Sequence, residues 1–303
     1  NVRFLGRPCF DFSNRNGSNG VYAEDKDIID AHSQPFNFDY GENIELSGIN
    51  VANSGSWTCC FSGCKNVTVR DLILIGYRTF SDGVMISDCE NVSVSGCFVR
   101  TGDDAMEVKS TTGGSVPLKN VVFEYNAVWT DKGIAYGSVY ETSSNRQGVV
   151  WRHNSVGFAL ANWSEHLGCT TISMEGSGNT TDSDLHFEDI EIYASYCPVT
   201  TIVLHNGGTV RDVYFENIRA KYIDLRSTGA GWYRGAIDFV VYNSDKGEIE
   251  DFAIKNIYFD NIDLAGTKLT PENKKELITT KFAAGFDEIF RDYRSIRVNT
   301  LTK

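Results

Sequence analysis

Two short acidic motifs, Ser81-Asp82-Gly83 and Thr101-Gly102-Asp103-Asp104, contain the side chains best suited to chemistry. Three carboxylates gathered at one place can hydrolyse an acetal, the linkage that joins sugars. One carboxylic acid with a raised pKa protonates the leaving oxygen, while the other carboxylates orient and deprotonate a water molecule. The motifs also fit two other interpretations, ordinary Asp-Gly turns and a calcium site.

A repeated pattern along the chain predicts the fold that positions these acids. Each copy has a turn residue, often Asn, a strand of alternating β-branched residues, and a second short apolar strand. Asn43, Asn66, Asn91 and Asn120 begin four copies, at steps of 23, 25 and 29 residues. Such steps are typical of a solenoid in which each coil adds one strand to each of its parallel sheets. We therefore expect an all-β, single-stranded right-handed parallel β-helix, because the hairpin turns that a β-sandwich needs are sparse.

The repeat should bring the three carboxylates to one face. Asp82 lies 16 residues after Asn66, and Asp103 and Asp104 lie 12 and 13 residues after Asn91, so all three follow the second strand of adjacent coils. Coils about 4.8 Å apart allow carboxylate separations of roughly 5 to 9 Å. This range includes both retaining and inverting geometries, so spacing leaves the stereochemistry open.

The domain organisation predicted from the sequence is a catalytic β-helix over residues 1–268 and a C-terminal cap over residues 269–303. Thr270 as N-cap and Pro271 in the first turn predict a helix that extends to about Arg291. This helix would cover the edge of the sheet. Longer steps elsewhere leave room for loops, which in solenoids commonly line a binding face.

Composition narrows the possible partners. A net charge of −12 disfavours nucleic acid, and no run approaches the roughly 18 apolar residues that a membrane span needs. We therefore expect a monomer that binds a polysaccharide or oligosaccharide, with no nucleic-acid or membrane partner.

Cysteines and glycosylation sequons predict a secreted protein. The eight cysteines lack the paired spacing of a zinc site, which favours disulfides. Sequons begin at Asn16, Asn66, Asn91, Asn162 and Asn179, although Asn66 and Asn91 also stand where the repeat requires a turn residue. No signal peptide opens the chain, which fits a mature form or a fragment.

The segment around the acids resembles the polygalacturonases, glycoside hydrolase family 28. Their pattern is Thr-Asp-Gly followed, at nearly the same separation, by Gly-Asp-Asp-Cys-Ile-Ala-Ile-Lys-Ser; here the second part reads Gly102-Asp103-Asp104-Ala-Met-Glu-Val-Lys109-Ser110. The resemblance implies an inverting mechanism in which Asp103 is the general acid and Asp82 and Asp104 hold the attacking water. Lys109 matches the family lysine, and we assign it to substrate binding; a solvated strand lysine is the alternative. We expect no metal and no cofactor.

The next coils depart from the family. Polygalacturonases continue with Gly-His-Gly-Ile-Ser-Ile-Gly-Ser, whereas this chain has Lys132 in place of the histidine. Their following coil has Arg-Ile-Lys, where a uronate carboxylate finds its charged partner, and this chain offers Val156-Gly157-Phe158-Ala159-Leu160. We therefore expect a neutral glycan of dextran, α-glucan or galactoside type. The dextranase and isopullulanase family (49), the α-1,3-glucanase family (87) and the α-galactosidase family (110) are similar more loosely.

Five further residues are candidates for substrate contacts. Two lie in the coil after the acids and one in the strand beyond, while the loop contributes an aromatic residue and a histidine whose simpler interpretation is an exposed loop residue. These are Lys132, Tyr136, Glu141, Trp163 and His166. Glu141 is also the best reserve acid, followed by Glu107. Cleft walls or stacked core positions are expected for Trp57, Trp232, Tyr233 and Arg234.

The function predicted from the sequence is thus inverting hydrolysis of a glycosidic bond in a neutral glycan. Three alternatives stay open: a polygalacturonase proper, a β-helix polysaccharide lyase that uses calcium or a basic residue, and a non-catalytic glycan-binding β-helix.

Overall fold

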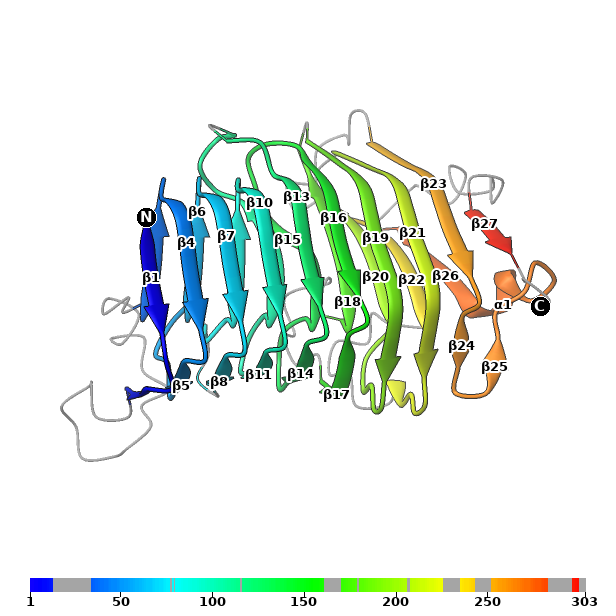
Figure 1. The fold of residues 1–303 in the computed structure, drawn as a ribbon. Coiled ribbons are helices and arrows are strands. Elements are labelled where there is room, and N and C mark those ends of the chain that lie inside the picture. The colour runs from blue at the N-terminus through cyan, green and yellow to red at the C-terminus, as the bar shows by residue number, and fades with distance from the viewer. Residues whose placement is uncertain are drawn as a thin grey trace.

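The chain folds into a right-handed parallel β-helix, which confirms the predicted fold (Figure 1). The computed structural model describes residues 1–12, 34–76, 78, 80–114, 116–160, 170–178, 180–205, 208–225, 235–242, 252–282 and 296–299. Within them the strands form two sheets, of 18 and 9 strands, here named sheet A and sheet B. Trp163, His166 and the aromatic pair at 232 and 233 lie outside the described residues.

Sheet B takes one strand from each successive coil and follows the order of the coils. Its strands are β3 Phe36–Asp39, β6 Cys59–Ser62, β9 Val84–Ser87, β12 Met106–Ser110, β15 Tyr136–Thr142, β18 Ile172–Ser177, β20 Thr200–His205, β22 Ile237–Tyr242 and β26 Ile278–Phe282.

Sheet A takes the other strands of each coil. They are β1 Val2–Leu5, β2 Cys9–Asp11, β4 Glu42–Ser47, β5 Asn50–Ala52, β7 Lys65–Arg70, β8 Ile73–Ile75, β10 Glu90–Ser95, β11 Phe98–Thr101, β13 Lys119–Glu124, β14 Ala127–Thr130, β16 Arg146–Arg152, β17 Ser155–Ala159, β19 Thr181–Ile192, β21 Gly208–Ala220, β23 Phe252–Asp260, β24 Asp263–Leu264, β25 Thr267–Lys268 and β27 Ile296–Asn299.

The turn asparagines stack from coil to coil. Asn66 Nδ2 donates to Asn43 Oδ1 at 3.1 Å, Asn91 Nδ2 to Asn66 Oδ1 at 3.2 Å, and Asn120 Nδ2 to Asn91 Oδ1 at 3.0 Å. All four have a φ of 55° to 59°, a left-handed conformation that Asn tolerates better than most residues. These contacts fix the register that the period of 23 to 29 residues predicts.

The core is a single buried column. Val67 stands in register with Ile44 on one side and Val92 on the other, and all three are nearly inaccessible. Further along the helix, stacked aromatic rings replace the aliphatic residues, with neighbouring centroids 4.5 to 5.6 Å apart. These rings belong to Phe123, Trp151, Phe187, Phe215 and Phe259.

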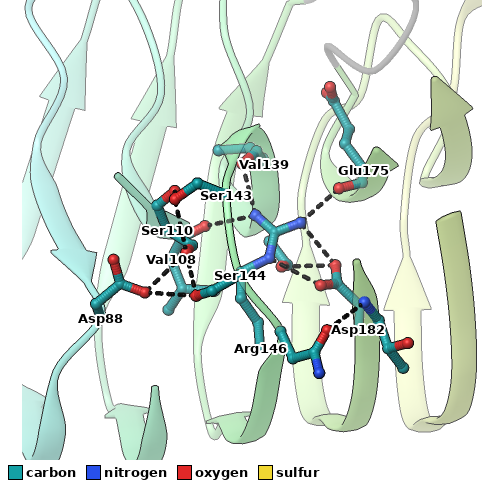
Figure 2. A network of polar contacts seen from close by, with 12 residues as sticks. Asp88, Val108, Ser110, Val139, Ser143, Ser144, Arg146, Glu175 and Asp182 are labelled. Atoms are coloured by element: carbon teal, nitrogen blue, oxygen red, sulfur yellow. Dashed lines mark hydrogen bonds and ion pairs between the residues drawn. The ribbon is translucent and has the colours of Figure 1, made fainter. Parts of the chain in front are cut away.

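A buried ion pair between β16 and β19 of sheet A lies inside the solenoid, and its hydrogen bonds reach across to sheet B (Figure 2). The guanidinium of Arg146 contacts the Asp182 carboxylate through Nε at 2.8 Å and Nη2 at 2.8 Å, and neither side chain is exposed. Arg146 also donates to the carbonyl oxygens of Val108, Val139 and Glu175, which belong to three neighbouring strands of sheet B. It therefore helps to hold β12, the strand that carries Lys109.

The C-terminal segment differs from its prediction. Helix α1 covers only Lys274–Leu277, and Ile278–Phe282 forms β26, which pairs with β22. The residues Ile278, Thr279 and Thr280 are β-branched and favour a strand. Past residue 282, β27 pairs with β23, so the described part of this segment continues both sheets. No helix among the described residues is long and apolar enough to cross a membrane.

The expected disulfides are absent among the described residues. Seven cysteines are free thiols there, and six of them are buried, while Cys169 lies outside the described residues. The reason is positional: Cys59, for example, is in register with Val84 and occupies the same core column. Cysteine acts here as a small apolar side chain.

Candidate active site

Asp82, Asp103 and Asp104 converge at one edge of sheet B, as the coil period predicts. Asp82 lies two residues before β9 and Asp104 two residues before β12, and these strands are neighbours. The backbone pairs the two turns directly, because Gly83 N donates to Asp104 O at 2.8 Å. The acids of successive coils therefore stand side by side.

Two glycines allow the turns to approach this closely. A Cβ on Gly83 would lie 2.3 Å from Ala105 O, and a Cβ on Gly133 would lie 2.4 Å from the carbonyl carbon of Asp103 and 2.5 Å from Asp104 Oδ1. Neither space admits a larger residue without a shift of the backbone. The acidic turn is thus clamped between the coil before it and the coil after it.

Hydrogen bonds hold the aspartates within this turn. Asp104 Oδ1 accepts from Ile134 N at 2.9 Å, and Asp103 Oδ1 accepts from Asp104 N at 3.0 Å. Thr101 Oγ1 donates to the carbonyl oxygen of Asp103 at 2.6 Å. Asp103 and Asp104 remain partly exposed, whereas only 2% of Asp82 is accessible.

Lys109 lies among carboxylates instead of facing a ligand. Its Nζ is 3.4 Å from Asp82 Oδ2, 3.4 Å from Glu107 Oε1 and 3.0 Å from Glu141 Oε2, and it stands 4.5 Å from the centroid of the Trp57 ring. With a side chain only 3% exposed, Lys109 has little surface to offer a substrate. This corrects the predicted role, because the strand turns Lys109 toward the acids and its neighbours then cover it.

Burial and mutual repulsion keep protons on this cluster. Burial, reinforced by the charges of Asp82 and Asp104, holds the pKa of Asp103 well above its usual value. Burial also raises the pKa of Asp82, to about 7, against the opposing charge of Lys109. A site with one carboxyl protonated and a neighbour ionised near neutral pH meets the requirement for general acid and base catalysis.

The spacing of three carboxylates also suits a cation. One oxygen each from Asp82, Asp104 and Glu107 lies within 4.8 Å of the others. The ammonium of Lys109 already stands against Asp82 and Glu107, and a second positive charge there would be repelled. The arrangement favours proton chemistry over metal binding.

The remaining predicted residues have different surroundings. Tyr136 is fully buried, and its hydroxyl donates to the carbonyl oxygens of Asn126 and Ser155 at 3.3 and 3.0 Å. It is a core residue, which corrects its predicted contact with sugar: Tyr136 is in register with Met106 and shares its inward face. Glu141 is 42% exposed, and Lys132, in the turn that follows β14, is partly exposed.

The strand expected to bind a uronate is also placed differently. Residues 156–160 lie largely in β17 of sheet A, whereas the strand beside β15 in sheet B is β18, where Ser173 pairs with Gly137. The residues of β18 are Ile-Ser-Met-Glu-Gly-Ser, so this strand contains neither Arg nor Lys. The Arg and Lys of the polygalacturonase pattern therefore have no counterpart in β18, just as they have none in residues 156–160.

Sequence reasoning ranked Glu107 only as a second reserve acid, yet it lies within the cluster. The signal was present in the alternation of β12, where Met106 and Val108 are core residues and Glu107, which lies between them, faces the acids.

Comparisons with known proteins agree with this geometry. Residues 22–227 match the family described as glycosyl hydrolases family 28. The chain is 24% identical over 208 residues to a polygalacturonase of Brassica napus, covering 60% of this chain and 47% of that protein. It is 25% identical over 185 residues to a probable polygalacturonase of Vitis vinifera, covering 60% of this chain and 31% of that protein.

A solved structure shares the fold. The family 28 exopolygalacturonase of Yersinia enterocolitica superposes with a TM-score of 0.51 at 14% identity, over 86% of this chain and 46% of that chain. The chain therefore spans less than half the length of each of these relatives.

Proposed function

The chain belongs to family 28 of the glycosyl hydrolases, and we propose that it hydrolyses, with inversion, a glycosidic bond of a polygalacturonate-type polysaccharide. The observation that carries this proposal is the convergence of Asp82, Asp103 and Asp104 on adjacent coils at one edge of sheet B. Acid-catalysed displacement by water needs a proton donor and a water-binding carboxylate on opposite sides of one bond.

The proposed roles follow from exposure and charge. Asp103, partly exposed and with a pKa held high by burial, gives its proton to the leaving oxygen as the bond from that oxygen to the anomeric carbon breaks. Water attacks the anomeric carbon from the opposite face, and its proton passes to Asp82 or Asp104. Asp104, fixed by the Ile134 amide, orients that water.

The substrate class rests on the relatives, which are named polygalacturonases. A second candidate, a neutral glycan, is favoured by one specific observation: β18 contains no Arg or Lys to pair with a uronate carboxylate. Secretion remains a proposal and now rests on the sequons alone, since the described cysteines are free.

A reducing-sugar screen tests both candidates. The wild-type chain, Asp103→Asn and the surface control Glu124→Gln are incubated with polygalacturonate, dextran, pullulan, α-1,3-glucan and galactosides. We expect release from polygalacturonate that Asp103→Asn lowers at least about 1,000-fold and that Glu124→Gln leaves unchanged. Undiminished activity in Asp103→Asn would refute the assigned acid, release from a neutral glycan alone would favour the second candidate, and ultraviolet-absorbing unsaturated products would indicate a lyase.

A further inference from the structure

Glu107 is a fully buried carboxylic acid on the strand that carries the site. Met106 and Val108 point into the core, and Glu107 and Lys109 alternate to the outer face, toward the aspartates.

The immediate neighbours of Glu107 offer it no hydrogen bond. Its register partner on β9 is Met85, whose side chain is apolar, and its register partner on β15 is Gly137, which has no side chain. Neither oxygen of Glu107 accepts a hydrogen bond from a donor among the described residues, and the positive charge beside it is the ammonium of Lys109, 3.4 Å from Oε1. A buried ionised carboxylate in such surroundings is costly.

The charges around Glu107 do not balance if every carboxylate is ionised. Asp82, Asp104 and Glu107 each place an oxygen within 4.8 Å of the others, and Lys109 supplies one positive charge. Asp104 has the Ile134 amide as a donor, whereas Glu107 has none. The proton that relieves this repulsion is therefore best placed on Glu107.

We infer that Glu107 is a positioning residue that stays protonated and donates a hydrogen bond to Asp82 or Asp104, so that these two remain ionised and oriented toward the attacking water. The inference rests on the proposed function. Burial and the two neighbouring carboxylates raise the pKa of Glu107 well above its usual value, against the opposing charge of Lys109, and a proton that Glu107 shares with Asp82 or Asp104 lowers the pKa of that aspartate. The titratable groups around it are Cys60, Asp82, Asp104, Lys109, Glu141 and, through Asp104, Glu175.

The protonation state is measured first, without any activity assay. The full chain is labelled with carbon-13 at the glutamate carboxyl groups, and the carboxyl resonances are followed by NMR as the pH is varied. We expect a glutamate signal that is still protonated at pH 7, that Glu107→Gln removes and that Glu124→Gln retains. If Glu107→Gln keeps every protonated glutamate signal that the wild type shows, the inference is overturned.

Two variants of similar size then test the hydrogen bond. Glutamine keeps an N–H donor, so Glu107→Gln should retain kcat within about threefold. Methionine fills the space but donates nothing, so Glu107→Met should lower kcat about 100-fold with little change in KM. Circular dichroism verifies that both variants fold.

The outcomes separate the possible roles. Glutamine and methionine variants that both keep the kcat of the wild type would show a role in packing only and would overturn the inference. An inactive glutamine variant beside an inactive methionine variant would show that Glu107 acts as an ionised carboxylate, which also overturns it. A wild-type chain without glycan hydrolysis would refute the proposed function, and the NMR signal would still decide whether Glu107 holds the proton.

Discussion

Lys109 Nζ lies 3.4 Å from Asp82 Oδ2, and both side chains are almost completely buried beside the acidic turn. Lys109, which the sequence analysis assigns to substrate binding, thus forms an ion pair with one of the proposed catalytic carboxylates. In a low-dielectric site this ammonium partly offsets the cost of ionising Asp82.

Removal of that ammonium should shift the pH dependence of the enzyme. Burial sets the pKa of Asp82 at about 7, and Lys109 opposes the shift, so Lys109→Met should raise this pKa further. Because Asp82 must be ionised to accept a proton, the acid limb of kcat/KM should move to higher pH, by about one unit or more. A pH profile beside the surface control Lys119→Met tests this; an acid limb that stays in place would show that Asp82 does not set it.

Asp82 should also limit stability near neutral pH. Its folded-state pKa lies above the ordinary value of 3.8, so between about 4 and 7 the folded state binds more protons than the unfolded state. Stability therefore falls as the pH rises through this window. Asp82→Asn, which stays neutral, should raise the free energy of unfolding at pH 7 by about 1–2 kcal/mol while it abolishes activity. Urea unfolding at pH 5 and 7 tests this, and a variant less stable than wild type at pH 7 would contradict it.

The close contact between Gly133 and the acidic turn predicts that a side chain added at this position lowers catalytic activity. In Gly133→Ala the new Cβ would press on Asp104 Oδ1 and on the backbone of Asp103. A small displacement of catalytic groups lowers kcat, here by about 100-fold. The matched control is Gly157→Ala, whose Cβ would have only ordinary contacts at 3.7 Å. Equal kcat values in the two variants would show that the aspartates tolerate the shift.

Much of this arrangement follows from the sequence because a solenoid repeats. The turn asparagines give the register, the register gives the coil, and the coil places Asp82 beside Asp104 without any other information. Each strand needs only the alternation of apolar residues to show which side faces the core.

The errors arose where the repeat is interrupted or where two patterns compete. Residues 161–169 lie between β17 and β18, so counting along the chain assigned the uronate-binding position to β17 in the wrong sheet. Tyr136 was misplaced because its inward direction depends on its pairing with Met106, which aligning the two coils would have shown. The burial of Lys109 depends on Trp57 and Glu141 from other coils, and no local pattern encodes those contacts.

The asparagine stack should contribute measurably to stability. In Asn91→Ala the chain loses the bonds to Asn66 and from Asn120 and places alanine at a φ of 59°. We expect a loss of about 1–3 kcal/mol in the free energy of unfolding. Asn91→Gly removes the same bonds without backbone strain and should lose less, so urea unfolding of both variants separates the two causes. Equal stability of the alanine variant and wild type would contradict a structural role for the stack.

The buried pair in Figure 2 predicts the largest loss of stability. Arg146→Met leaves Asp182 ionised or newly protonated with no cation beside it, and Ser138 Oγ, at 2.9 Å, as its remaining side-chain donor. It also removes donors from the Val139 and Glu175 carbonyl oxygens. Breaking such a pair costs about 3–5 kcal/mol. The control Arg152→Met breaks an ion pair with Glu124 in which the arginine is 42% exposed, and it should cost at most about 1 kcal/mol. Thermal and urea unfolding would contradict the prediction if both arginine variants lost the same small amount.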